Sequence, residues 1–457
     1  MRFCSLFLVV TLAVGYSADW ARFRGPNGSG VGDGTNLPVE FGPGKNVAWK
    51  TAAPFGRSSP IVAAGHVYLT ASEGGQLLTL AYDARTGKEL WRRAVKPAKI
   101  QETYKANDAA SSTPAADGEN VYVFFRDVGL IAYSHAGVER WRVALGPFDS
   151  FYGLTASPIV AGGKVLLLCD QTKGSYLLAV DARTGKTVYR VERPGMGVGW
   201  SVPIVHEDQV IAVGSTRVDS YHLGTGERRW WLPLPSMGAM GSPVIAGDAV
   251  IVTASGSDQP WLPTFAAVLA ARDTDRDGEL GRTEAAPETE WFEHFGWLDE
   301  NSNGKVTAAE WNAARDAGLG EYGAVAIPLQ SRGAATVRWR VKRNLPYVPS
   351  PVLYEGVFYM VKDGGIVTSL DPATGKTLKQ GRAPQAPGQY LASPVAADGK
   401  LYLVNEEGLL TVMRAGAQWE PLARNEVGEE VYATPAVDGS RLLVRTRGSL
   451  YAFANSK

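Results

Sequence analysis

A short proline-containing motif recurs eight times along the 457-residue chain. In each copy, small or hydroxyl-bearing residues come before the proline and an apolar stretch follows it. The eight prolines are Pro60, Pro114, Pro158, Pro203, Pro243, Pro351, Pro394 and Pro435. Six of the seven intervals between them measure 40–54 residues, and the interval from Pro243 to Pro351 measures 108. A period of this size is typical of a propeller or a solenoid, and the long interval indicates an insertion.

Each repeat unit has the pattern of four short strands. After the proline strand come a turn such as AAGH or AGGK, an alternating strand, a third strand, and a glycine turn that leads to a strand with an aromatic residue. The glycine turn and final strand read YDARTGKELW at 82–91 and VDARTGKTVY at 180–189. The glycine permits a positive φ, and the aromatic side chain can pack against the neighbouring unit.

Eight units of four strands predict an all-β fold, an eight-bladed β-propeller. The last unit, from Pro435 to Lys457, lacks a fourth strand with its aromatic residue. The stretch NVAWKTA at 46–52 has that missing pattern, with Trp49 in the docking position. We therefore expect the N-terminal strand to complete the C-terminal blade and close the ring, because this removes two free sheet edges.

The DxxTG-xxx-W pattern resembles the pyrroloquinoline-quinone (PQQ) repeat. That repeat occurs in eight-bladed quinoprotein dehydrogenases and in the propeller lipoprotein that assists outer-membrane protein assembly. The stretches DWARFRGPNGSGV and NVAWKTAAPFGRSSP are similar to the openings of exported bacterial PQQ-like propellers. The resemblance covers nearly all of the chain after residue 17, and it implies the fold more strongly than any activity.

The long interval contains a segment, residues 263–320, that differs from the rest of the chain. We place it in the fifth blade, between the second and third strands. Its stretches DTDRDGELGRTE (273–284) and DENSNGKVTAAE (299–310) have the residue order of EF-hand calcium loops, with glycine at the sixth position and glutamate at the twelfth. The flanking stretches are helix-like, so we expect a small α-helical insertion formed by an EF-hand pair.

The two loops supply the hard oxygen ligands that calcium requires. The predicted ligands of the first site are Asp273, Asp275, Asp277, the carbonyl of Glu279, and Glu284. Those of the second site are Asp299, Asn301, Asn303, the carbonyl of Lys305, Thr307 and Glu310. The second site has fewer carboxylates, and we expect it to bind calcium more weakly. We expect a structural role for the metal, with regulatory and catalytic roles as the alternatives.

The sequence shows no recognisable catalytic constellation. The PQQ dehydrogenases that the chain resembles use a vicinal cysteine pair, whereas Cys169 is the only cysteine after residue 17. Cys169 lies in the apolar stretch VLLLCD, where a buried strand residue is expected. The five histidines share no metal-ligand spacing, and the motifs of serine hydrolases, phosphate-binding loops and zinc proteases are absent. We therefore expect a binding or assembly scaffold, and we keep a PQQ-dependent alcohol or sugar dehydrogenase as the alternative.

The loops that lead into the inner strands open on one face of the ring, and most carry an aromatic residue or a methionine. They are Phe55, Tyr104, Tyr152, Trp200, Met240, Tyr347, Tyr390 and Tyr432. We predict that Tyr152, Trp200, Tyr347, Tyr390 and Tyr432 form a binding face for a protein, peptide or glycan. The alternative is that these side chains only pack adjacent blades together at the rim.

Residues 1–17 have the pattern of a signal peptide, with an early arginine, an apolar run and small residues near the end. Blades then occupy 18–262 and 321–457, on either side of the insertion. Basic and acidic residues are equal at 46 each, so no global charge favours nucleic acid. No later stretch is apolar enough to span a bilayer. We expect an exported monomer, periplasmic or secreted.

Overall fold

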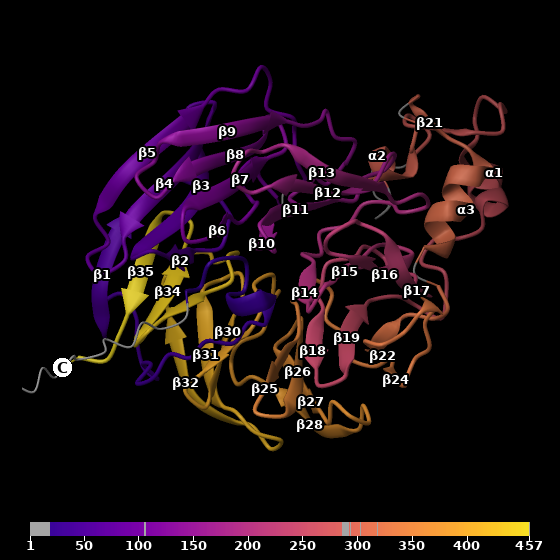
Figure 1. The fold of residues 1–457 in the computed structure, drawn as a ribbon. Helices are drawn as coiled ribbons and strands as arrows, with labels where there is room; N and C mark the ends of the chain where they lie inside the picture. Colours follow the sequence, from indigo (N-terminus) through magenta and orange to yellow (C-terminus); the bar gives the residue numbers. More distant parts are fainter. Residues whose placement is uncertain are drawn as a thin grey trace, which may run out of the picture.

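The structure, a computed structural model, describes residues 19–104, 107–285, 292, 294–301, 303–317 and 319–456. The predicted signal peptide at 1–17 lies outside the described residues. Eight antiparallel sheets are arranged as the blades of a propeller (Figure 1), which confirms the predicted fold class. None of the helices in the described part of the chain is long and apolar enough to cross a membrane.

The first four blades follow one another along the chain, each from its inner to its outer strand. Blade 1 contains β2 (Ile61–Ala63), β3 (His66–Glu73), β4 (Gln76–Asp83) and β5 (Glu89–Val95), and blade 2 contains β6 (Ala115–Ala116), β7 (Asn120–Phe125), β8 (Gly129–Ser134) and β9 (Glu139–Ala144). Blade 3 contains β10 (Ile159–Ala161), β11 (Lys164–Cys169), β12 (Tyr176–Asp181) and β13 (Thr187–Glu192). Blade 4 contains β14 (Ile204–His206), β15 (Gln209–Val213), β16 (Arg217–His222) and β17 (Arg228–Pro233), with the short strand β23 (Gly333–Ala334) added in parallel to β17.

The other four blades complete the ring. Blade 5 contains β18 (Val244–Ala246), β19 (Ala249–Ala254), β22 (Gly323–Pro328) and β24 (Trp339–Val341), and blade 6 contains β25 (Val352–Tyr354), β26 (Val357–Lys362), β27 (Ile366–Leu370) and β28 (Thr377–Arg382). Blade 7 contains β29 (Val395–Ala397), β30 (Lys400–Val404), β31 (Leu409–Arg414) and β32 (Glu420–Glu426). Blade 8 contains β33 (Ala436–Asp438), β34 (Arg441–Arg445), β35 (Ser449–Phe453) and, as its outer strand, β1 (Val47–Ala52).

Blade 8 joins the two ends of the described chain. The strand β1 pairs with β35 in antiparallel register, and Figure 1 shows the indigo β1 beside the yellow β35. The indole Nε1 of Trp49 donates a hydrogen bond of 3.1 Å to the carbonyl of Ala84 in blade 1. The N-terminal strand therefore closes the ring, as the sequence predicted.

Aromatic residues on outer strands dock on turn glycines of the next blade. A Cβ atom on Gly87 would lie 2.4 Å from the ring of Trp49, and one on Gly137 would lie 2.8 Å from the ring of Trp91. The two glycines have φ values of 71° and 77°. The repeat thus needs glycine here for two reasons, since the backbone is left-handed and the aromatic ring leaves no room for a side chain.

The residue before each motif proline links neighbouring inner strands. Its backbone N–H donates to the hydroxyl at the same position of the next blade, and the 3.0 Å bond from Ser350 to Ser393 is an example. Seven donors of this kind lie in the described residues: Ser59, Thr113, Val202, Ser242, Ser350, Ser393 and Thr434. We call this series of hydrogen bonds the hydroxyl belt. It is interrupted after Ser157, because the next blade has Val202, which carries no hydroxyl, at this position. Buried N–H groups need acceptors, which explains the hydroxyl residues of the motif.

Residues 20–32, which come before β1, contact the inner strands of several blades. Arg22 and Arg24 are buried, and their guanidinium groups donate to the carbonyls of Pro203 and Pro351, two motif prolines of different blades. Burial lowers the pKa of both arginines to about 9. The segment also contains the short 3-10 helix η1 (Pro26–Gly28). It acts as a plug that is bound to the inner strands from several sides.

The insertion connects β19 to β22, the second and third strands of blade 5. It contains α1 (Phe265–Arg272), β20 (Leu280–Gly281), α2 (Phe295–Leu298), β21 (Lys305–Val306) and α3 (Ala308–Asp316). Its buried residues form a cluster of their own: Leu262, Phe265, Val268, Leu280, Ala285, Phe295, Leu298, Val306, Trp311 and Ala314. The insertion is therefore a small helical unit with a separate core, at the upper right in Figure 1.

Candidate functional site

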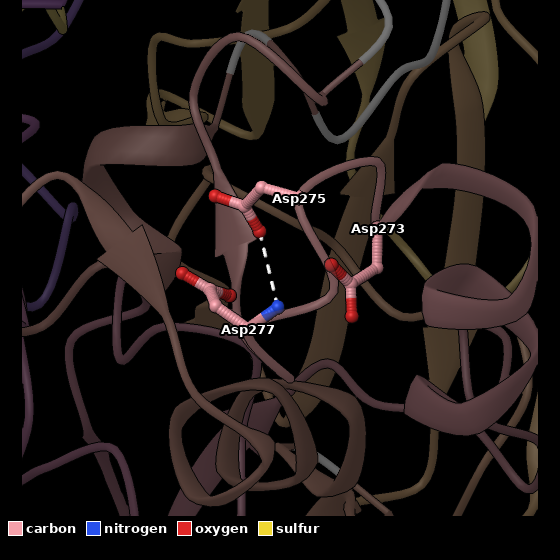
Figure 2. A group of neighbouring side chains, drawn as sticks. All are labelled: Asp273, Asp275 and Asp277. Carbon is pink, nitrogen blue, oxygen red and sulfur yellow. Dashed lines mark hydrogen bonds between the residues drawn. The ribbon is translucent and has the colours of Figure 1, made fainter.

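Three aspartates of the first loop lie close together. Asp273, Asp275 and Asp277 each offer a carboxylate oxygen, and these oxygens all lie within 4.8 Å of one another. Figure 2 shows the three side chains around the turn, with the backbone N–H of Asp277 donating to Asp275 Oδ1 at 3.1 Å. Because like charges repel at this spacing, the arrangement suits a cation between the carboxylates.

The glutamate at the twelfth position completes the first loop. The backbone N–H of Thr274 donates to Glu284 Oε1 at 2.7 Å, and that of Gly281 donates to Oε2 at 2.8 Å. These hydrogen bonds hold the pKa of Glu284 below its usual value, since they stabilise the carboxylate form. Both oxygens of Glu284 are thereby turned toward the loop interior, as a bidentate metal ligand requires.

The second loop repeats this arrangement. Gly304 N–H donates to Asp299 Oδ2 at 2.8 Å, as Gly278 N–H donates to Asp273 Oδ2 in the first loop. Glu310 accepts from the backbone N–H groups of Asn301 and Thr307 at 3.2 and 2.9 Å. The remaining predicted ligands of this loop are Asn303, whose Oδ1 accepts from Lys305 N–H at 2.9 Å, and the carbonyl of Lys305.

The two loops are joined by a short ladder. Leu280 pairs with Val306, and Gly281 pairs with Lys305. Leu280 and Val306 are fully buried, which places the two loops back to back over the core of the insertion. The structure thus brings each set of sequence-predicted ligands together in its own loop and couples the loops through backbone hydrogen bonds.

Two features of the first loop fit a hard divalent cation. The buried Oδ1 atom of Asp273 has no hydrogen-bond partner in the described structure. The ammonium group of Lys305, from the second loop, contacts Asp277 Oδ2 and lowers the pKa of Asp277. A cation in the loop would therefore coordinate the Asp273 oxygen that has no hydrogen-bond partner. It would also neutralise the carboxylate of Asp277, which Lys305 contacts in this structure.

A large cavity opens on one face of the ring, with a volume of about 1640 Å³. Its lining includes most of the residues that the sequence placed on this face: Tyr104, Tyr152, Trp200, Met240, Tyr347 and Tyr432. Tyr347 is 46% exposed. Phe23, from the plug, also belongs to the lining, so the cavity has a floor and opens on one side.

The prediction is wrong for Tyr390. This side chain is only 1% exposed, and its hydroxyl donates to the carbonyl of Ala386 at 2.9 Å. The ring packs in the core between blades 6 and 7, so it cannot contact a ligand. Phe55 is 37% exposed but lies outside the cavity lining, beside a shallower acidic depression.

The insertion forms part of the cavity wall. The hydroxyl of Tyr152 and Nδ1 of His294 are hydrogen bonded at 2.8 Å, and Trp261, Leu298 and Glu310 also line the cavity. This position follows from the topology, because the loop between the second and third strands of a blade opens on the same face as the loops that carry the aromatic residues.

Sequence reasoning missed several residues of the cavity. Met196 and Met237 line the cavity as Met240 does, and Asp363 and Glu406 occupy equivalent loops of blades 6 and 7. The methionines fall within 45 residues of the sequence, which was an available signal. The two carboxylates gave no comparable signal, since acidic residues are common in exposed turns.

Cys169, at the end of β11, lies away from the cavity lining. Its side chain is fully buried, and burial raises the pKa of its thiol to about 12. It packs in the core between blades 2 and 3, as expected for a strand residue.

Comparison with known proteins connects this architecture to two groups of propellers. The family described as "Outer membrane protein assembly factor BamB" matches residues 31–169, 78–312 and 330–457. The quinohemoprotein alcohol dehydrogenase ADH IIB of Pseudomonas putida is 30% identical over 179 residues, which make up 38% of this chain. The match covers 25% of the length of that relative.

Solved structures support the fold at low sequence identity. BamB from Moraxella catarrhalis superposes with a TM-score of 0.55 at 13% identity, over 89% of this chain and 97% of the other. A europium-containing methanol dehydrogenase superposes with a TM-score of 0.61 at 11% identity, over 96% and 98% of the two chains. The repeats, the ring and the family match agree: this chain belongs to the PQQ-like β-propeller family described as outer membrane protein assembly factor BamB.

Proposed function

We propose that this protein is an exported, calcium-binding β-propeller that acts as a binding scaffold. The observation that supports the calcium assignment is the pair of equivalent loops, with Glu284 held by backbone N–H groups of its loop and a buried Asp273 oxygen that has no hydrogen-bond partner in the described structure. Calcium binds six to eight such oxygens.

The first site would use the carboxylates of Asp273, Asp275, Asp277 and Glu284 with the carbonyl of Glu279. The second site would use Asp299, Asn301, Asn303, the carbonyl of Lys305, Thr307 and Glu310. Extracellular calcium modules bind at about 10⁻⁴–10⁻³ M, and we expect the second site to be the weaker one. The metal would stabilise the insertion, because the two loops pair through Leu280 and Val306, which are buried in the core of the insertion.

The scaffold assignment is supported by the wide cavity on the aromatic face and by the family description, which names an assembly factor. A partner protein would enter the cavity from the open face. The signal-peptide pattern at 1–17 supports export to the periplasm or the medium. The neutral overall charge gives no support for a nucleic-acid partner.

A PQQ-dependent alcohol or sugar dehydrogenase is the second candidate. It is favoured by the similarity of 179 residues to a quinohemoprotein alcohol dehydrogenase. Against it, Cys169 is buried away from the cavity and has no cysteine neighbour in the described residues.

Calorimetric titration of the chelator-stripped protein with calcium, followed by PQQ, tests these assignments. Two calcium-binding events without quinone binding are expected for a calcium-dependent scaffold. Absence of calcium binding would overturn the metal assignment. Stoichiometric PQQ binding would instead favour the dehydrogenase.

A further inference from the structure

We propose that the cavity between the ring and the insertion binds an extended segment of a partner protein that combines apolar side chains with lysine or arginine. The proposal rests on the scaffold function above and specifies the chemistry of the partner. The cavity volume, about 1640 Å³, exceeds the range of about 300–1,000 Å³ that is usual for small-ligand sites. It therefore suits a segment of several residues better than a compact metabolite.

Part of the cavity lining is apolar. It includes Met196, Met237 and Met240 and the indole rings of Trp200 and Trp261. Of the six methionines in the sequence, these three belong to the cavity lining, although Met196 is only 4% exposed, whereas Met360 and Met413 lie in blade cores. Flexible methionine side chains adjust to different apolar partners, and aromatic rings add contact area at a small cost in entropy.

The rest of the cavity carries an excess of negative charge. Apart from the proposed calcium ligand Glu310, its lining includes the five carboxylate residues Glu192, Glu300, Asp316, Asp363 and Glu406, against the three cationic residues Arg57, Lys173 and Arg193. Glu192 and Asp316 pair with Arg190 and Arg315, which leaves Glu300, Asp363 and Glu406 as the main acidic groups. Arg193 is already bound to two buried aspartates, Asp170 and Asp219, at 2.8 and 2.9 Å. The lining therefore favours a positively charged ligand.

Glu406 is the lining residue that we expect to contact a lysine or arginine side chain of the partner. Burial, together with the nearby carboxylates of Glu407, Asp363 and Glu430, raises the pKa of Glu406. A cationic side chain of the partner would relieve this repulsion. Asp363 holds the backbone N–H of Tyr390 through Oδ1 at 2.8 Å, which fixes its place at the rim.

The insertion supplies the remaining wall, and the second metal loop positions it. Glu310 belongs both to that loop and to the cavity lining, and it forms the capping box of α3 with Thr307. Along α3, Ala313, Ala314 and Ala317 line the cavity. Calcium at the second loop would therefore set the position of α3 and tighten binding of the partner segment.

Selection from a library of short random peptides, carried out with the whole chain in the presence of calcium, tests the proposal. The selected peptides should combine aromatic or aliphatic residues with lysine or arginine. Binding of the best synthetic peptide should weaken about tenfold or more in Trp200→Ala and in the double variant Asp363→Asn, Glu406→Gln. Glu420→Gln is the matched control, because Glu420 is an exposed carboxylate outside the cavity, and it should bind normally. Chelation of calcium should also weaken binding.

Three outcomes would overturn the assignment: no selected peptides, selected peptides without cationic residues, or equal binding by the cavity variants and the wild type. Binding on a glycan array without peptide selection would likewise replace the peptide with a sugar ligand. Calcium binding in the calorimeter without peptide selection would leave the calcium assignment intact and remove only the peptide site. The two proposals therefore fail separately.

Discussion

Hydroxyl groups before the motif prolines hold the inner strands of neighbouring blades together. Ser393 is typical, since its Oγ accepts from the backbone N–H of Ser350 and its own N–H donates to Thr434. All three residues are buried at the bottom of their loops, where the cavity lining begins. The repeated Ser-Pro and Thr-Pro pairs are thus a requirement of the ring and not a sign of a catalytic serine.

The substitution Ser393→Ala should destabilise the ring, because it leaves the buried N–H of Ser350 without an acceptor. An unsatisfied buried donor costs about 1–3 kcal/mol, and we expect a decrease of this size in the free energy of unfolding measured with denaturant. Ser331→Ala is the control, because the hydroxyl of Ser331 bonds to Pro328 within its own turn. An equal decrease in both variants would contradict a special role for the belt.

The insertion is an element with its own core, and its stability should depend on calcium. Glu284→Gln combined with Glu310→Gln removes one bidentate carboxylate from each loop, so calcium binding should fall by at least about tenfold. The helices α1 and α3 should lose protection from hydrogen exchange, whereas the blades should keep theirs. Hydrogen exchange detected by mass spectrometry, with and without calcium, measures both effects.

Glu279→Gln combined with Glu300→Gln provides the matched control. It removes the same charge from the insertion, but neither side chain is a predicted ligand, since Glu279 contributes its carbonyl. Calcium binding should survive in this variant. Loss of protection in the blades of the Glu284, Glu310 variant would show that the insertion and the ring fold as one unit.

Closure of the ring depends on the pairing between β1 and β35, which we call the seam. Trp49→Ala should remove the docking of β1 on blade 1, and loss of a buried tryptophan costs about 3–5 kcal/mol. We expect β1 and β35 to exchange amide hydrogens faster than other outer and central strands in this variant. Trp91→Ala is the control, because Trp91 makes the same contact between blades 1 and 2, within the continuous chain. If both variants leave the seam equally protected, the closure does not depend on Trp49.

Much of the fold could be predicted because the local pattern repeats. The spacing of the prolines, the glycine-to-aromatic distance and the unpaired strand at 46–52 follow from strand length, turn geometry and the cost of a free edge. The two EF-hand-like loops could be located for a similar reason, since each falls within twelve consecutive residues; their binding of calcium stays a prediction. Such patterns are local, and short-range geometry determines them.

The position and the lining of the cavity depend on tertiary structure. It joins Trp200 of blade 4, Glu406 of blade 7 and His294 of the insertion, which are far apart in the sequence. Tyr390 occupies a loop like that of Tyr347, yet it turns into the core and bonds to Ala386. The repeat by itself determined the ring and the closing strand, and the twelve-residue pattern located the two EF-hand-like loops within the insertion. The direction of each rim side chain and the contact between the insertion and Tyr152 depend on packing between distant segments, which local pattern does not encode.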